Sequence, residues 1–197
     1  GLNRAKGKIV IFTDDDVLVS SKYLFKIART FDDIQVGGVT GPTIIPKELR
    51  SGRDLLKFHN NSIINKIYNY IVLENQPYSY AKQFKSGGFG LGSTFEEALK
   101  LPYSFECDWL EGCNMAYRKE AIMNIDGFDE TYGGCGDYSE PDLAFKVKAM
   151  GYKLIYNPKA YVTHYISQER GDIVDTYTRQ KNFMKFHKKW FKWNWRY

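Results

Sequence analysis

Hydrophobic and polar positions alternate along the chain in short blocks that predict strands and helices in turn. The apolar, β-branched run at residues 8–13 predicts a buried strand that ends at three carboxylates. Residues 21–31 follow with helical spacing, and residues 36–46 predict a strand and turns marked by Gly and Pro. The apolar positions expected on one face of that helix are Leu24, Ile27, Ala28 and Phe31. A strand, an acidic turn, a helix and another strand in this order indicate an α/β fold.

The second half of the chain continues this pattern. We predict a helix at 53–75 whose apolar stripe packs into the core, and a further helix that begins near Glu140. The stripe consists of Leu55, Leu56, Ile63, Ile64, Ile67 and Ile71. A strand at 153–164 is predicted to break at Asn157 and Pro158, because proline cannot continue a strand's hydrogen bonding.

Composition and charge narrow the classes of function. With 197 residues, 43% of them hydrophobic and 26% charged, the chain resembles an ordinary globular protein. The net charge of +5 favours anionic partners, but the sequence shows no nucleic-acid-binding module, so we expect no nucleic-acid partner. Neither a membrane-spanning run nor a signal peptide is evident, which favours the cytoplasm or the cytoplasmic face of a membrane. Three cysteines without paired spacing predict buried thiols in a reducing compartment.

Three adjacent carboxylates, Asp14, Asp15 and Asp16, follow the first predicted strand. Like charges this close repel one another, so either the turn is solvated or a cation belongs there. In an extended backbone Asp14 and Asp16 point to one side and Asp15 to the other, which gives two carboxylates to one ion. Mg²⁺ and Mn²⁺ prefer such oxygen ligands and share them with phosphates. An acidic turn before a helix is the alternative.

Two further groups carry candidate chemistry. Glu140 and Asp142 lie at the start of a predicted helix, where a carboxylate can take a proton from a hydroxyl or simply cap the helix. His164 ends a predicted strand, and it becomes a candidate metal ligand only if folding brings it to the acidic turn.

Four segments in this order resemble the inverting GT-A-fold glycosyltransferases of family 2, and the resemblance covers most of the chain. They are AKGKIVIFTDDDVLV, VGGVTGP, WLEGCNMAYRKEAIMNIDGFDE and YSEPDLAFKVKAMGYKLIYNPKAYVTH. The resemblance implies a Rossmann-like mixed sheet flanked by helices, in a catalytic domain at 1–182. It also implies transfer of a sugar, with inversion, from a nucleotide-diphosphate sugar to an acceptor hydroxyl on a glycan, a lipid-linked carrier or a protein.

The resemblance also assigns roles to residues. The family's DxD motif falls on the acidic turn, where Asp14, Asp16 and His164 would bind Mn²⁺ or Mg²⁺, and Asp14 and Asp15 would lie near the donor. The family's Trp-x-x-Gly segment, which lines the sugar and acceptor pocket, falls on Trp109 and Gly112. Its acidic base falls on Glu140 and Asp142, of which Glu140 is favoured. In the family these acids are adjacent, whereas here Pro141 separates them.

Two features depart from this assignment. The chain begins just before the DxD strand, so the resemblance implies an N-terminally incomplete domain that lacks the nucleotide-binding strands. Residues 183–197 interleave Trp and Phe with Lys and Arg, which predicts a basic aromatic tail or helix that contacts either a membrane surface or the domain itself. The alternative functions are a retaining GT-A transferase and an inactive, binding-only domain.

Overall fold

The computed structural model describes residues 2–50, 63–134, 136–166 and 176–191. The α-helices in these ranges are α1 (Tyr23–Thr30), α3 (Ile63–Val72), α4 (Lys119–Met123), α5 (Ser139–Ala149) and α6 (Thr176–Trp190). The strands are β1 (Ile9–Phe12), β2 (Val17–Val19), β3 (Val36–Thr40), β4 (Thr43–Ile44), β5 (Phe105–Glu106), β6 (Met115–Arg118), β7 (Lys153–Tyr156) and β8 (Val162–His164). Short 3₁₀ turns lie at Leu2–Arg4, Lys47–Leu49, Gly92–Thr94 and Glu96–Lys100.

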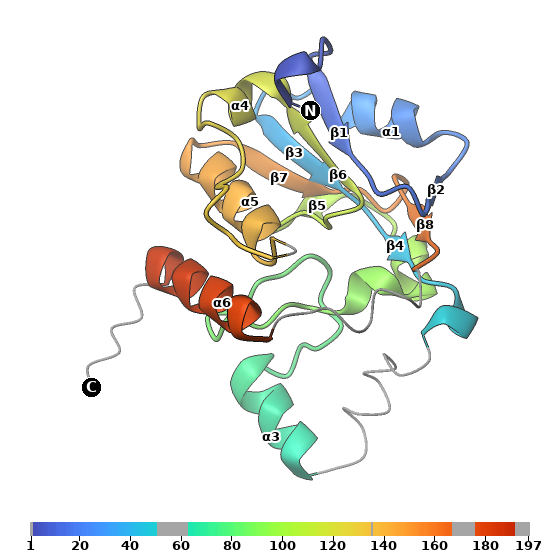
Figure 1. The fold of residues 1–197 in the computed structure, drawn as a ribbon. Coiled ribbons are helices and arrows are strands. Elements are labelled where there is room, and N and C mark those ends of the chain that lie inside the picture. Colours follow the sequence, from blue (N-terminus) through green and yellow to red (C-terminus); the bar gives the residue numbers. More distant parts are fainter. Residues whose placement is uncertain (1, 51–62, 135, 167–175, 192–197) are drawn as a thin grey trace.

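The strands form two sheets. The larger is mixed, with the order β1-β6-β3-β7-β5, in which β3 and β7 are parallel and the other neighbouring pairs are antiparallel. The smaller sheet has the order β2-β8-β4 and lies at one end of the larger one (Figure 1). The chain passes from β1 to β2 through the acidic turn, so that turn lies where the two sheets meet.

Helices cover both faces of the larger sheet (Figure 1). On one face, a buried cluster joins α1 to alternate residues of the strands. The helix side contributes Tyr23, Ile27 and Phe31, of which Phe31 directly follows the helix. On the other face, α4 and α5 bury side chains that include Ile122 and Leu143 against the remaining strand residues. This alternation between faces is the one expected of strands buried on both sides in an α/β fold.

Helix α6 packs on α5. It runs without a break across the predicted boundary between residues 182 and 183. The Phe186 side chain is fully buried, and its ring centroid lies 5.4 Å from that of Phe145 on α5. The loop that contains Gly87 contacts the same helix, since a β-carbon at Gly87 would overlap the ring of His187. Residues 183–191 therefore contact the domain, and residues 192–197 lie outside the described part of the chain.

Several predicted elements agree with the structure. The strand predicted at 153–164 does break at Asn157 and Pro158, because β7 and β8 belong to different sheets. Cys107 and Cys113 are buried free thiols, as predicted, and Cys135 lies outside the described residues.

One predicted core face was only partly right and another was wrong. In the face predicted at 21–31, Ile27 and Phe31 are buried, whereas Leu24 and Ala28 are exposed. Leu24 is 67% exposed, because Tyr23 takes the inward position of α1 and its hydroxyl donates a hydrogen bond to the buried Asn114 side chain. The helix predicted at 53–75 is described only from Ile63, and Ile63, Ile67 and Ile71 are exposed rather than in the core. Helix α3 lies away from both sheets, so its apolar stripe has no sheet face to cover (Figure 1). Leu55 and Leu56 fall outside the described residues.

Within the described ranges, no helix is both long enough and apolar enough to cross a membrane.

Candidate active site

A cavity of about 710 Å³ opens where the two sheets meet. It is bounded by the end of β1, by the loop before β6, by the start of α5 and by the end of β8. Its polar lining includes Asp14, Glu111, Glu140 and His164. Groups that are 150 residues apart in the sequence therefore face one space, which is where α/β sheets bind ligands. A separate hollow of about 560 Å³, between residues 75–82 and 105–108, contains none of these four.

Strand pairing brings His164 to the acidic turn. β2 and β8 are antiparallel with Val17 opposite His164, and the Tyr165 backbone N–H donates to the Asp16 carbonyl at 2.9 Å. His164 Nε2 consequently lies 3.1 Å from Asp16 Oδ1 and 3.9 Å from Asp14 Oδ2. Asp15 is exposed, so the alternation expected from the sequence is present: two carboxylates turn inward and the middle one turns out.

The turn and the histidine fit a hard divalent cation. Asp16 Oδ1 and His164 Nε2 are both buried, and neither makes a hydrogen bond to a described residue although only 3.1 Å separates them. Buried polar atoms normally have partners, so two such atoms beside each other indicate a group that both would bind. Carboxylate oxygens with one imidazole nitrogen are ligands that Mn²⁺ accepts. Asp16, His164 and Asp14 are therefore the residues that could hold such an ion.

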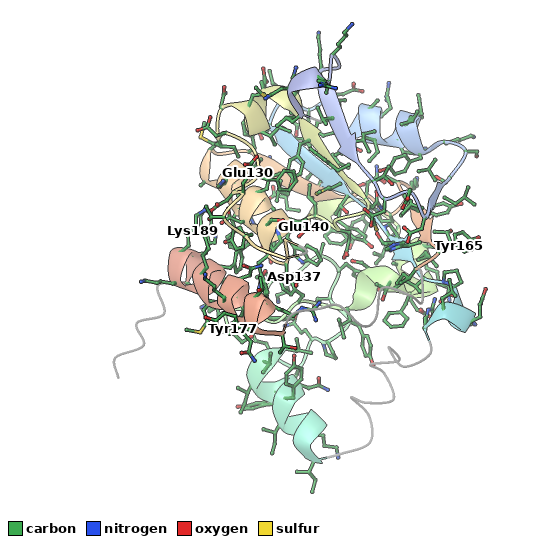
Figure 2. The ribbon with its side chains drawn as sticks, in the orientation of Figure 1. Glu130, Asp137, Glu140, Tyr165, Tyr177 and Lys189 are labelled. Carbon is green, nitrogen blue, oxygen red and sulfur yellow. The ribbon has the colours of Figure 1, made fainter. Side chains whose placement is uncertain are left out.

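Glu140 enters the cavity from the first turn of α5 (Figure 2). Burial raises the pKa of its carboxyl, and the negative charges of Asp137 and Asp14 raise it further. Gly112 makes room for this side chain, because a β-carbon at residue 112 would come within 3.1 Å of Glu140 Oε1. Two residues that the sequence assigned to separate motifs are thus in contact.

Glu111 is a second carboxyl in the cavity and was not predicted from the sequence. Burial raises its pKa to about 7, with a smaller contribution from the charge of Glu140. Its backbone N–H donates to the Thr40 hydroxyl at the end of β3, which fixes this part of the loop. The sequence shows Glu111 only as one acid among many in a loop, so its burial beside Glu140 could not be anticipated.

Asp142 does not line the cavity. Its carboxylate is fully buried against α6, where it accepts hydrogen bonds from Trp190 Nε1 at 2.7 Å and from Lys189 Nζ. Tyr132 donates to the same carboxylate at 3.3 Å, and Lys146 Nζ lies 3.6 Å away. Of the two acids proposed as the base, only Glu140 therefore faces the cavity.

Trp109 also lies outside the cavity lining. Its ring meets that of Phe89 edge-on, with centroids 4.9 Å apart, and packs against the buried cluster beside α5.

Asn114 fixes the end of the loop that follows Trp109. Its side-chain amide donates to the carbonyls of Gly41, Pro42 and Ala160. This buried clamp joins the ends of three chain segments around the cavity, and no motif in the sequence indicated it.

Comparison of the sequence with protein-family models and with curated proteins finds no match. The fold, in contrast, is similar to solved glycosyltransferases. A crystal structure of GalNAc-T7 with UDP, GalNAc and Mn²⁺ aligns with 96% of this chain and 34% of its own, at a TM-score of 0.62 and 13% identity. The mannosyltransferase PcManGT from Pyrobaculum calidifontis, in complex with GDP-Man and Mn²⁺, aligns with 86% of this chain and 35% of its own, at a TM-score of 0.47 and 19% identity.

The alignment with GalNAc-T7 defines the class of fold. The chain has a mixed α/β, GT-A-like architecture, with mixed sheets and flanking helices, as the sequence predicted. It spans about a third of the length of the solved structures that it matches.

Proposed function

We propose that this domain transfers a sugar from a nucleotide-diphosphate donor to an acceptor hydroxyl, with inversion and with the help of a divalent cation. The observation that carries the proposal is that the Glu140 carboxyl shares one cavity with Asp14 and His164, next to Asp16. A base and a candidate cation site on one cavity are what single-displacement transfer requires. The GT-A-like fold supports the same class of reaction.

Glu140 is the proposed base. Inversion needs a group that takes the acceptor hydroxyl's proton as its oxygen attacks the anomeric carbon from the face opposite the nucleotide. Burial raises the pKa of Glu140, so its carboxylate is a stronger base than an exposed one. Since Asp142 is enclosed by Trp190 and Lys189, we assign it no proton transfer.

Asp16 and His164, with Asp14, would hold Mn²⁺ or Mg²⁺. When bound, the cation supplies positive charge that offsets the charge growing on the departing diphosphate. The similarity of the fold to GalNAc-T7, whose structure contains UDP and Mn²⁺, supports a nucleotide and manganese as ligands of this domain. The exposed Asp15 would contact the donor beside the ion.

Membership of glycosyltransferase family 2 is part of the proposal, and it rests on the four sequence segments. A glycan, a lipid-linked carrier and a protein all remain acceptors that the hydroxyl chemistry allows. A peripheral contact of residues 183–197 with the cytoplasmic face of a membrane would fit a lipid-linked acceptor.

The test is Mn²⁺-dependent transfer from a panel of sugar nucleotides, followed as release of the nucleoside diphosphate. We expect Glu140→Gln to lower turnover by about 10²- to 10⁴-fold while Mn²⁺-dependent binding of the nucleoside diphosphate persists. Glu130→Gln, which changes an exposed carboxylate to the same amide, is the matched control.

Three outcomes would contradict the proposal. Equal turnover by wild type and Glu140→Gln would exclude Glu140 as the base. Retention of the donor's anomeric configuration, read by NMR of the first product, would favour a retaining transferase. Tight donor binding without any transfer, by the wild-type protein, would favour a binding-only domain.

A further inference from the structure

Cys113 contacts the candidate metal ligand His164 at the ring nitrogen Nδ1, and its sulfur also lies within 4.8 Å of an Asp14 carboxylate oxygen. Cys113 Sγ lies 3.5 Å from His164 Nδ1, within hydrogen-bond distance for sulfur. The other ring nitrogen, Nε2, lies 3.1 Å from Asp16 Oδ1 and 3.9 Å from Asp14 Oδ2. The two nitrogens of one imidazole therefore have different neighbours, sulfur at Nδ1 and carboxylates at Nε2.

This arrangement has a consequence for the proton of the ring. A neutral imidazole carries one N–H and one lone pair, and the hydrogen bond made by one nitrogen sets which nitrogen is free to bind a metal. With a cation on Nε2, the single N–H of the ring is at Nδ1 and is directed at the sulfur. Metal-binding histidines commonly donate their second N–H to a neighbouring group in this way.

The sulfur is held firmly enough to orient the ring. Cys113 is 8% exposed and precedes Asn114, whose amide donates to three carbonyls from two other chain segments. Met115, the next residue, is paired with Phe12 at the end of β1. The segment that carries the sulfur is thus fixed to the strand that leads into the acidic turn.

We infer that Cys113 is a positioning residue, which holds His164 so that Nε2 is presented to the cation together with Asp14 and Asp16. The inference deepens the proposed function and rests on it. Direct ligation by sulfur is the competing arrangement, because ligand atoms of Asp14, Cys113 and His164 all lie within 4.8 Å of one another. The 3.5 Å contact of the sulfur is with Nδ1, whereas the carboxylates approach Nε2, and this difference favours positioning.

The experiment compares Cys113→Ala and Cys113→Ser with wild type and with Cys107→Ala, which removes the other described buried thiol. Mn²⁺ affinity is measured by calorimetry, and the environment of His164 Nδ1 is read from imidazole ¹⁵N shifts of the protein loaded with Mg²⁺, which is diamagnetic. We expect Cys113→Ala to weaken Mn²⁺ binding by about 10- to 100-fold and to shift the Nδ1 resonance. Cys113→Ser, which can still accept the hydrogen bond, should recover most of the affinity, and Cys107→Ala should match wild type.

Three results would overturn the inference. One is unchanged Mn²⁺ affinity in Cys113→Ala, and another is a wild-type ring that stays protonated at Nε2 when Mg²⁺ is bound. The third is an intense sulfur-to-metal charge-transfer band when Co²⁺ is added to wild type, which would make Cys113 a direct ligand. Failure of the proposed function is distinguishable, because in that case wild type itself would bind no Mn²⁺, whatever residue 113 is.

Discussion

Gly112 and Glu140 are in contact across the cavity, and the missing side chain of the glycine defines the space that the carboxyl occupies. A β-carbon at residue 112 would lie 3.1 Å from Glu140 Oε1 and 3.5 Å from the carbon that carries it. Gly112 does not have a positive φ, so close approach rather than backbone conformation requires glycine here. The Trp-x-x-Gly pattern thus corresponds to one glycine beside the proposed base.

We predict that Gly112→Ala lowers transfer at least about 10-fold while leaving the free energy of unfolding within about 1 kcal/mol of wild type. The methyl group would displace the Glu140 carboxyl by a few tenths of an ångström, and proton transfer depends on such distances. Turnover and denaturant unfolding measure the two quantities. Gly133→Ala is the control. Its β-carbon would meet Thr178 at a similar distance, 3.2 Å, but this contact is remote from the cavity. Equal loss of activity in both variants would contradict the prediction.

Cation binding should depend on Asp16 and not on Asp15. We expect Asp16→Asn to weaken Mn²⁺ binding more than 10-fold, because Asp16 Oδ1 lies 3.1 Å from His164 Nε2 and both atoms are buried. Asp15→Asn removes the same charge from the adjacent, exposed position, so it should change Mn²⁺ affinity by no more than about 2-fold. Calorimetric titration with Mn²⁺ alone measures both. A similar loss in the two variants would mean that Mn²⁺ responds only to the net charge of the turn.

The sequence predicted the architecture because hydrophobic periodicity reports which strands are buried on both faces. It failed at Leu24, since helical spacing alone does not say which face of a short helix turns inward. Tyr23 decides that face through its hydrogen bond to Asn114, a contact across 91 residues. It also failed on α3, where an apolar stripe lies on a helix that no sheet covers in the described part of the chain.

The sequence predicted those residues of the candidate site that belong to motifs: acids and a histidine that follow predicted strands in the order of the family it resembles. Glu111 and the contact of Cys113 with His164 were not predicted, because both depend on packing that no local pattern reports. The assignment of Glu140 over Asp142 was also beyond the sequence, since both acids lie in the first turn of α5. Only the position of α6, which covers Asp142 and leaves Glu140 facing the cavity, separates their roles.

Asp142 should contribute to stability. We predict that Asp142→Ala lowers the free energy of unfolding by about 3 kcal/mol, since Trp190 Nε1 and the Lys189 ammonium would lose a fully buried partner. Asp137→Ala is the control, because its ion pair with Arg179 also joins this region to α6 but is more exposed, and it should cost less than about 1 kcal/mol. Denaturant unfolding measures both variants. A small change for Asp142→Ala would mean that α6 docks without this carboxylate.

Glu111 should make stability depend on pH. Its pKa is raised by burial from 4.5 to about 7, so between these values the folded state binds more protons than the unfolded state. The contribution of Glu111 to the free energy of unfolding should therefore be largest below pH 4.5 and fall as pH rises toward 7. Glu140, whose pKa is also raised, contributes in the same direction.

The variant Glu111→Gln cannot ionise, so it should lack the Glu111 part of this loss. Relative to wild type, it should gain stability between pH 4.5 and pH 8, on the order of 2 to 3 kcal/mol in the absence of metal. Denaturant unfolding in EDTA at several pH values measures this difference, with Glu97→Gln as an exposed control whose curve should parallel wild type. If Glu111→Gln and wild type lost stability equally over that interval, Glu111 would be ionised in the folded protein at neutral pH. The ionised carboxylates of Glu111 and Glu140 would then both lie beside the acidic turn, and a bound cation would offset still more negative charge.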